Sequence, residues 1–151
     1  MASGDPIRVF VTHAWHESDD YQRVFEFLES ARNFRYQNCS APERRPPGGV
    51  EPEREELRRQ IGAAEAVIAL ASMLPQQTAL LHFQMVFAQS QRKPVLVLPV
   101  FGGAQNLPPE FFKGLFDEQL QWDERALVDG LRRQARHEAT GRWDVVEFKL
   151  D

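Results

Sequence analysis

Two stretches without a single polar residue constrain the fold of this chain most. AVIALA (66–71) and PVLVLPV (94–100) are continuous apolar runs, and each is bounded by polar or turn-forming residues. A run of this length is typical of a strand that is covered on both faces. We therefore predict an α/β protein in which a parallel sheet lies between two layers of helices.

Strand and helix patterns alternate along the rest of the chain. Further strands are predicted at 7–12, 34–38 and 118–122, with a short edge strand at 143–148. Helices are predicted after a Ser18 cap, at 52–64, 78–88 and 110–116, and after an Asp123 cap. This order predicts one domain over 1–151, built on a doubly wound, five-stranded, mainly parallel sheet with helices on both faces.

Ligands of such sheets bind beyond the carboxyl ends of the strands, near the point where the strand order reverses. The loops expected at this edge are 12–18, 38–50, 72–77 and 101–109. We therefore look for binding or catalytic residues in these four segments.

Composition limits where the protein works and what it binds. The net charge of −4 argues against a general affinity for nucleic acid or for an anionic membrane. No apolar run approaches the roughly 20 residues that a membrane helix needs. The single cysteine and the polar MASGDP start, which lacks a signal-peptide pattern, are typical of a reducing compartment. We predict a cytoplasmic protein with neither a nucleic-acid nor a membrane partner.

Several common nucleotide and hydrolase motifs are absent from the sequence. It contains no GxGxxG, no GxxxxGK[ST] and no GxSxG, and no acidic triplet follows the first strand. A conventional dinucleotide fold, a nucleoside triphosphatase, a phosphorylation receiver and a nucleophile-elbow hydrolase are therefore disfavoured.

Three groups of polar residues in the edge loops have two readings each. His13 and His16 either share a metal or hydrogen-bond backbone or ligand; without further ligands at a suitable spacing, no metal site is predicted. Cys39 is either a nucleophile or a small buried apolar residue. Arg44 and Arg45 either bind phosphate above the ligand edge or belong to a solvated surface.

The predicted helix 78–88 is apolar almost all round, which indicates burial. It nevertheless carries Gln84, and a buried amide without a partner costs roughly 1–3 kcal/mol. The surrounding structure must therefore supply partners for this side chain.

Taken together, six segments resemble the bacterial TIR-like domains of the Thoeris anti-phage defence family. They are RVFVTHAW, SDDYQRVFEFLE, FRYQNCSAPE, VIALAS, RKPVLVLPVFG and LQWDERALVDGLR. The family shows a Ser/Thr-His-Ser/Ala-Trp strand end, an Asn-x-Ser-x-Pro after the second strand and a Lys-Pro-Ile/Val before the fourth. The likeness extends from about Ile7 to Leu131.

The resemblance implies a flavodoxin-like fold with a nucleotide cleft at the carboxyl edge of the sheet. In the family, NAD is bound there and its nicotinamide–ribose bond is cleaved. The ADP-ribose-type product activates a partner effector. No separate cofactor is implied, because NAD would be the substrate or ligand. Self-association or an effector protein would complete the signalling.

The resemblance also assigns residues to the expected ligand site. By position, the first loop contributes Thr12, His13, Ala14 and Trp15, and the second begins with Asn38 and Ser40. Arg44 and Arg45 follow in the same second loop as candidate phosphate ligands.

The departure from the family lies at its catalytic glutamate, which stands four residues after a Trp. Here Leu80 replaces the Trp and Gln84 replaces the glutamate. A carboxylate can stabilise the oxocarbenium-like centre that forms as nicotinamide leaves, whereas an amide supplies no negative charge. Gln84 therefore either occupies a modified catalytic position or caps a loop backbone, and Glu17 or Glu110 could replace the missing carboxylate.

Three functions remain in view. The first is an enzyme that cleaves or cyclises NAD. The second is a catalytically silent TIR-like module that binds a nucleotide or a protein. The third is a nucleoside deoxyribosyltransferase-like enzyme, disfavoured because no glutamate at a helix start is suitably placed.

Overall fold

The computed structural model describes residues 5–138 and contains one five-stranded parallel sheet, in the order β2-β1-β3-β4-β5. The strands are β1 (Ile7–Val11), β2 (Tyr36–Asn38), β3 (Ala66–Leu70), β4 (Val95–Leu98) and β5 (Glu118–Gln119). The chain winds from β1 to β2 in one direction and from β3 to β5 in the other. The strand order therefore reverses between β1 and β3, as in flavodoxin-like folds.

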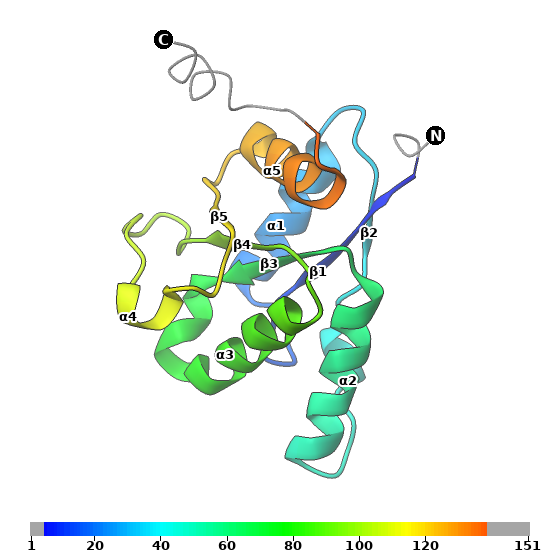
Figure 1. The fold of residues 1–151 in the computed structure, drawn as a ribbon, viewed down its shortest axis with the longest axis vertical. Helices are drawn as coiled ribbons and strands as arrows, with labels where there is room; N and C mark the ends of the chain where they lie inside the picture. The colour runs from blue at the N-terminus through cyan, green and yellow to red at the C-terminus, as the bar shows by residue number, and fades with distance from the viewer. Residues whose placement is uncertain (1–4, 139–151) are drawn as a thin grey trace.

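Helices cover both faces of the sheet, so the predicted doubly wound fold is confirmed (Figure 1). They are α1 (Asp19–Ser30), α2 (Val50–Ala63), α3 (Leu74–Ser90), α4 (Pro109–Phe112) and α5 (Glu124–Arg136). Two 3-10 turns, η2 (Pro42–Arg44) and η3 (Ala71–Met73), precede α2 and α3. Helices α1 and α5 pack together on one face of the sheet, and α2 and α3 pack together on the other.

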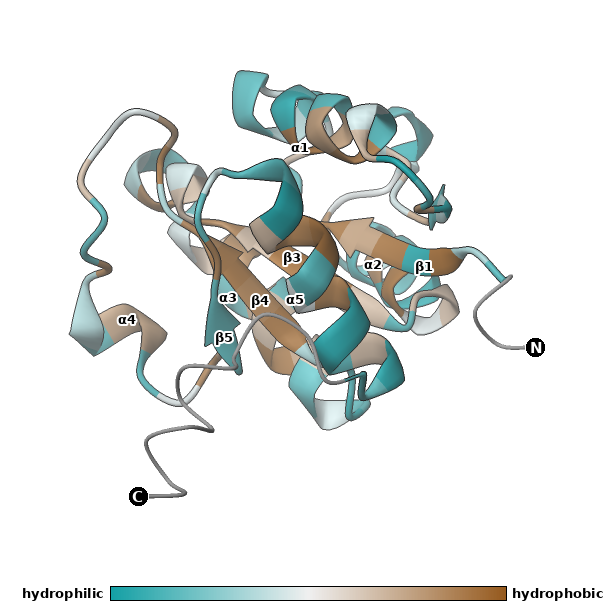
Figure 2. Ribbon diagram, turned by 90° about the horizontal axis from the view of Figure 1, so that it is seen from above, coloured by the Kyte–Doolittle hydropathy of each residue, from teal (hydrophilic) through white to brown (hydrophobic). Residues whose placement is uncertain are grey.

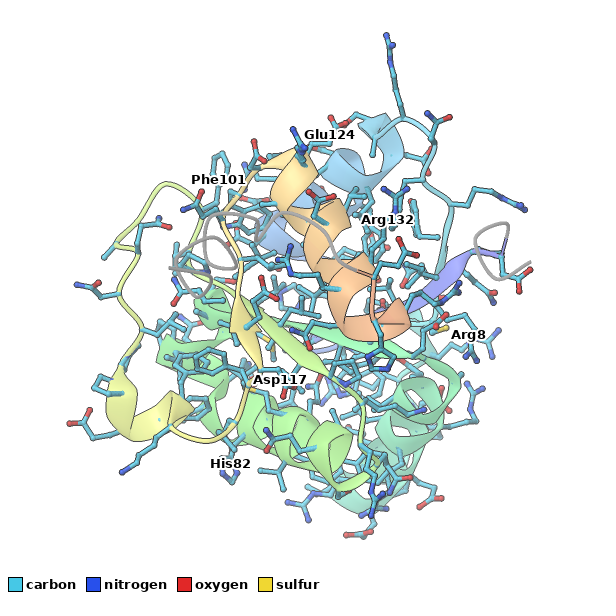
Figure 3. The ribbon with its side chains drawn as sticks, turned by 45° about the horizontal axis from the view of Figure 1, so that its top comes forward. Arg8, His82, Phe101, Asp117, Glu124 and Arg132 are labelled. Atoms are coloured by element: carbon cyan, nitrogen blue, oxygen red, sulfur yellow. The ribbon has the colours of Figure 1, made fainter. Side chains whose placement is uncertain are left out.

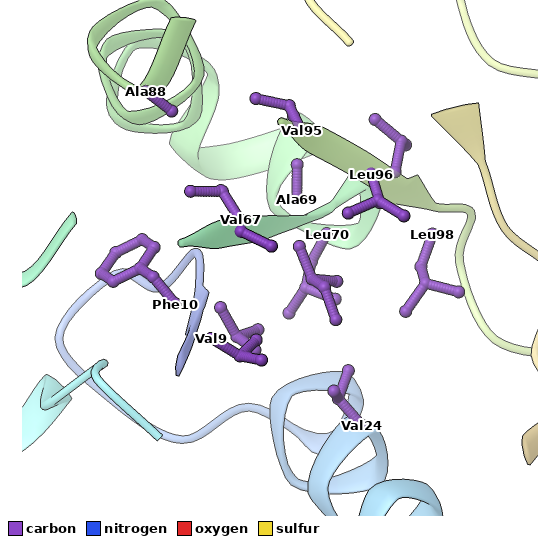
Figure 4. Close-up of a cluster of buried hydrophobic side chains, with 14 of the residues drawn as sticks. Val9, Phe10, Val24, Val67, Ala69, Leu70, Ala88, Val95, Leu96 and Leu98 are labelled. Atoms are coloured by element: carbon purple, nitrogen blue, oxygen red, sulfur yellow. The ribbon is translucent and has the colours of Figure 1, made fainter. Parts of the chain in front are cut away.

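The core lies around the two central apolar strands. Every residue of β3 and β4 is buried, as expected of strands covered on both faces. In Figure 4, Val24 of α1 and Ala88 of α3 lie on opposite sides of β3. Figure 2 shows these hydrophobic strands beneath helices whose outer surfaces are hydrophilic. Burial of apolar area on both faces, at about 25 cal/mol per Å², is the main force holding the layers together.

Two predicted helix caps are confirmed. The Ser18 hydroxyl accepts a hydrogen bond from the Tyr21 amide at 3.2 Å, and a carboxylate oxygen of Asp123 accepts one from the Ala126 amide at 2.9 Å. These bonds satisfy amides in the first turns of α1 and α5, which otherwise have no intrahelical partner.

The predicted loop at 72–77 is wrong, because helix α3 already begins at Leu74 and follows directly on η3. Pro75 lies in the first helical turn, where its fixed φ suits the helix and its missing N–H costs nothing. At Gln77 the backbone leaves helical geometry, with φ −129° and ψ 40°, so the helix is kinked. The first turn of α3 therefore lies at the carboxyl edge of the sheet.

The later elements are shorter than predicted. Helix α4 ends at Phe112 rather than at 116, and Gly114, with φ 74°, turns the chain back towards the sheet. Strand β5 ends at Gln119 rather than at 122. The edge strand predicted at 143–148 lies outside the described residues. Within residues 5–138, no helix has the length and apolar character required to span a membrane.

Candidate functional site

A pocket of about 300 Å³ lies at the carboxyl edge of the sheet, beyond β1 and β3, where the strand order reverses. It is lined by His13, Ala14, His16 and Ser18 from the loop after β1, and by Ser72, Met73 and 75–77 from the segment after β3. Two of the four segments predicted for this edge thus form one pocket. We call it the edge pocket.

Gln84 lies beneath the edge pocket and clamps the backbone of His13. Its side chain is fully buried, with 0% exposure. Its carbonyl oxygen accepts a hydrogen bond from the His13 amide at 3.1 Å, and its amide nitrogen donates to the His13 carbonyl at 2.8 Å. The second amide proton goes to the Leu80 carbonyl at 3.2 Å. Both donor protons and the acceptor are therefore engaged with backbone, which is the loop-capping reading of Gln84.

The imidazole of His13 continues this polar network towards α2. The Trp15 amide donates to Nδ1 at 3.2 Å, so Nδ1 carries no proton and Nε2 donates to the Gln60 carbonyl oxygen at 3.0 Å. Burial lowers the pKa of His13 below its ordinary value, and the Gln60 hydrogen bond partly opposes that effect. His13 is therefore a neutral, buried link in the structure, and only part of it reaches the pocket.

Gln60 repeats for the second edge loop what Gln84 does for the first. Its carbonyl oxygen also accepts from the Ala41 amide at 2.8 Å, and its amide nitrogen donates to the Ala41 carbonyl at 3.2 Å and to Glu56 at 2.9 Å. Gln60 was not predicted as a functional residue, although it lies three residues after Leu57 on the buried side of its helix, where an amide is unexpected. We refer to Gln84, His13 and Gln60 as the clamp network.

Two further residues of the first loop support its conformation. The Thr12 hydroxyl accepts a hydrogen bond from the Leu70 amide at 3.0 Å and so joins the ends of β1 and β3. Trp15 adopts a left-handed backbone with φ 66°, which is uncommon for a bulky residue, and its ring lies edge-on against His13. Its indole Nε1 is buried without a partner among residues 5–138. The hydrogen bonds from Gln84 to the His13 backbone hold the chain two residues before this strained turn.

Asn38 and Ser40 do not line the edge pocket but organise the second loop. The Asn38 carbonyl oxygen accepts hydrogen bonds from the Ser40 amide, at 2.9 Å, and from the Ser40 hydroxyl. The Tyr21 hydroxyl is 2.8 Å from the Ser40 hydroxyl and accepts from the Asn38 amide group at 3.2 Å. Burial raises the pKa of Tyr21, so the phenol stays protonated at neutral pH. These two predicted ligand residues thus tie the second loop to α1.

The arginines predicted to bind phosphate are also absent from the lining of the edge pocket. Arg45 donates to the Glu53 carboxylate at 2.9 Å, and Arg44 lies exposed on η2. The second loop therefore directs both side chains towards solvent and α2, in keeping with the solvated-surface reading.

The fourth predicted edge segment, 101–109, contacts α1 rather than the edge pocket. The Asp20 carboxylate accepts from the Phe101 amide at 3.2 Å, and the Arg23 guanidinium lies over the Phe101 ring at 3.9 Å from its centre. Figure 3 shows Phe101 on the side of the molecule opposite Arg8, which lies near the start of β1.

The histidines and the cysteine show no sign of metal or nucleophile chemistry. His16 has one ring nitrogen 3.1 Å from the Ala14 carbonyl, and residues 5–138 contain no group of three metal-ligating side chains. Burial raises the pKa of the Cys39 thiol, whereas a reactive cysteine needs a lowered one.

No carboxylate from residues 5–138 lines the edge pocket. Glu17 follows His16 in the first loop but faces another hollow, and Glu110 lies exposed on α4. Neither therefore replaces the missing glutamate at the pocket wall in this structure. The pocket can offer hydroxyls, amides, imidazole and backbone N–H groups, and these suit binding of a polar ligand.

No family model matches the chain, and no curated protein is significantly similar to it. The resemblance to TIR-like domains accordingly stays a prediction, which rests on the order and spacing of the motifs in this sequence.

The buried, neutral state of His13 predicts a loss of stability in mild acid. An unfolded imidazole titrates near pH 6.5. Because the folded pKa lies lower, the unfolded state binds more protons between the two values, and stability falls as pH drops below about 6.5. The loss should be about 1 kcal/mol per pH unit within that window.

Urea unfolding at pH 7.5, 6.5 and 5.5 measures this loss. His13→Asn should remove most of the pH dependence, whereas His82→Asn, at an exposed position, should leave it unchanged. Equal slopes in the wild type and the His13 variant would exclude His13 as its source.

Proposed function

We propose that this protein is a TIR-like module that binds an NAD-like nucleotide in the edge pocket without cleaving it. The observation that supports this most is that both amide protons and the side-chain carbonyl oxygen of Gln84 are hydrogen-bonded to backbone. The pocket above it is lined by polar groups, and none of the described residues contributes a carboxylate to it. Binding a nucleotide needs only polar groups, whereas stabilising an oxocarbenium-like centre needs a carboxylate.

The placement of two helix starts favours an anionic ligand. Ser18 caps α1, and Ser72 and Met73 immediately precede α3, so the amino-terminal ends of both helices border the pocket. The amino-terminal end of a helix carries a partial positive charge, which suits a pyrophosphate. The exposed His16 imidazole, whose Nδ1 lies 3.1 Å from the Ala14 carbonyl, offers its other ring nitrogen as an acceptor, and the Ser18 and Ser72 hydroxyls are suited to ribose.

In this role the nicotinamide–ribose bond of a bound NAD stays intact. The protein would then act by sensing the nucleotide, and its output would pass through self-association or an effector protein. The alternative, turnover to an ADP-ribose-type signal, requires a carboxylate that reaches the pocket from elsewhere in the chain.

Calorimetric titration with NAD and with ADP-ribose tests binding, and chromatography with mass spectrometry tests turnover. The wild type should bind, and nicotinamide should not exceed the no-protein level. His16→Ala and Gln77→Ala should each weaken binding about tenfold, as expected for one lost hydrogen bond to the nucleotide. His82→Ala and Gln91→Ala are the matched controls, because both positions are exposed and lie outside the edge pocket.

The outcomes separate the parts of the proposal. Nicotinamide release by the wild type would contradict the silent state and direct attention to Glu17 and Glu110. Failure to bind either nucleotide would contradict the assignment of the pocket. Equal losses in the test and control variants would contradict its location.

A further inference from the structure

A second hollow, of about 450 Å³, lies between α1 and the strand β2, and its chemistry is opposite to that of the edge pocket. Its floor contains the rings of Tyr21, Phe25 and Tyr36, whereas Glu17, Glu26 and Glu29 contribute carboxylates. Within the described part of the chain, no lysine or arginine lines it. We call it the α1–β2 groove.

The aromatic rings form a continuous series along the groove. The ring centres of Tyr21 and Phe25 are 5.1 Å apart, and those of Phe25 and Tyr36 are 5.7 Å apart. Such a surface attracts a cation through the negative faces of the rings, and attraction grows as the cation is desolvated. The groove therefore attracts a cationic side chain through its aromatic rings as well as through its carboxylates.

The charges at the groove are not balanced from within the described chain. Glu17 and Glu26 form no ion pair with any residue between 5 and 138, whereas Glu55 and Glu56 on α2 pair with neighbouring arginines. Glu29 accepts a hydrogen bond from the Tyr36 hydroxyl at 2.8 Å, and burial together with this carboxylate raises the pKa of Tyr36 to about 12. The phenol thus remains a donor that orients Glu29.

Among residues 5–138, β2 is the outermost strand of the sheet, and the groove runs beside this edge (Figure 1). The Arg35 carbonyl and the Cys39 amide bond to β1, so the intervening backbone groups of Tyr36 and Asn38 face away from the sheet. The side chains of these two residues, two positions apart, share the face that lines the groove. An added strand would therefore place alternate side chains above the aromatic floor.

We propose that the α1–β2 groove binds an extended, lysine- or arginine-rich segment of a protein partner. The segment pairs its backbone with the open edge of β2 and places a cationic side chain over the aromatic floor, between the carboxylates. Backbone pairing supplies affinity in this mode, and the charged groove selects the side chain. This function is separate from nucleotide binding, because the residues that line the groove differ from those that line the edge pocket.

The test uses a fluorescein-labelled octapeptide of alternating lysine and valine, with fluorescence anisotropy as the readout at physiological salt. The full-length wild type should bind it, whereas a glutamate–valine octapeptide should not bind. The triple substitution Glu17→Gln, Glu26→Gln, Glu29→Gln should weaken binding at least tenfold. A control triple, Glu51→Gln, Glu55→Gln, Glu110→Gln, removes as many charges elsewhere and should change affinity less than twofold.

A second peptide tests the strand pairing. Methylation of the backbone nitrogens along one edge of the lysine–valine peptide should weaken binding at least tenfold, because it removes the N–H donors that β2 would accept. Unchanged affinity would overturn the pairing with β2. Equal weakening by the two triple substitutions would show general charge attraction and overturn the groove assignment. Displacement of the peptide by spermidine at a comparable concentration would overturn the protein partner in favour of a small polyamine.

Discussion

Replacing Gln84 by glutamate is expected to destabilise the protein by about 3–5 kcal/mol at neutral pH, and by much less at low pH. The site has 0% exposure and presents two backbone carbonyls, of His13 and Leu80, to the side-chain nitrogen. A carboxylate would face both carbonyl oxygens without a proton. The buried charge would therefore be left uncompensated.

The pH dependence follows from the protonated form. A neutral carboxyl group can donate to the His13 carbonyl and accept from its amide, as the glutamine does. The folded state therefore raises the pKa of the introduced carboxyl above the unfolded value of about 4.3. The stability of the variant relative to the wild type is therefore highest below the unfolded pKa. It is lost as pH rises through the raised pKa of the folded state.

Denaturant unfolding of the wild type and the variant from pH 4.5 to 8 measures the difference at each pH. Gln84→Met is the control, because it removes the hydrogen bonds without adding a charge, so its deficit should not change with pH. A glutamate variant as stable as the wild type at pH 8 would show that the clamp can rearrange, and would reopen the reading of this position as catalytic.

The expected penalty bears on how the resemblance to NAD-cleaving domains is understood. The glutamine at this position has an architectural use of its own, because it fixes the loop that forms one wall of the edge pocket. A single substitution of Gln84 by glutamate would disrupt the hydrogen bonds that hold this wall. The new carboxylate would then lack an intact pocket in which to act. A change at Gln84 alone is therefore not expected to produce an NAD-cleaving enzyme.

The sheet could be predicted from sequence because its signals are local. The runs AVIALA and PVLVLPV have no polar residue and had to be covered on both faces; the first was found buried throughout, and the second is buried from Val95 to Pro99 but exposed at Val100. The caps Ser18 and Asp123 were also correct. The start of α3 was not, because Pro75 suits a loop and a first helical turn equally well. Local sequence did not decide between them.

The site was harder to predict because its contacts join distant parts of the chain. An amide in an apolar helix indicates that a partner exists, but the partner of Gln84 lies 71 positions away in sequence. The sequence suggested that Arg45 could bind phosphate, but its guanidinium forms an ion pair with the Glu53 carboxylate. The polar position of Gln60, on the buried side of α2 beside Leu57 and Ile61, was a signal that periodicity could have shown.

Replacing Gln60 by methionine is expected to cost roughly 2–4 kcal/mol and to release the second edge loop. Methionine keeps the length of the side chain but leaves the Ala41 amide and the Nε2–H of His13 without their partner, and the Ala41 carbonyl keeps only its bond from the Arg44 amide. Because Gln60 hydrogen-bonds both backbone groups of Ala41, the loss of stability should be greatest around this residue. Hydrogen exchange of the Ala41 amide should accelerate at least tenfold.

The matched control is Gln91→Met, at an exposed position at the end of α3, which should change stability by less than about 0.5 kcal/mol. Combining Gln60→Met with Gln84→Met should also show non-additivity, because both glutamines act on His13, one through its ring and one through its backbone. Unchanged exchange at Ala41, or strict additivity of the two substitutions, would mean that the two loops are held independently. The edge pocket would then have no mechanical link through His13 to the second loop.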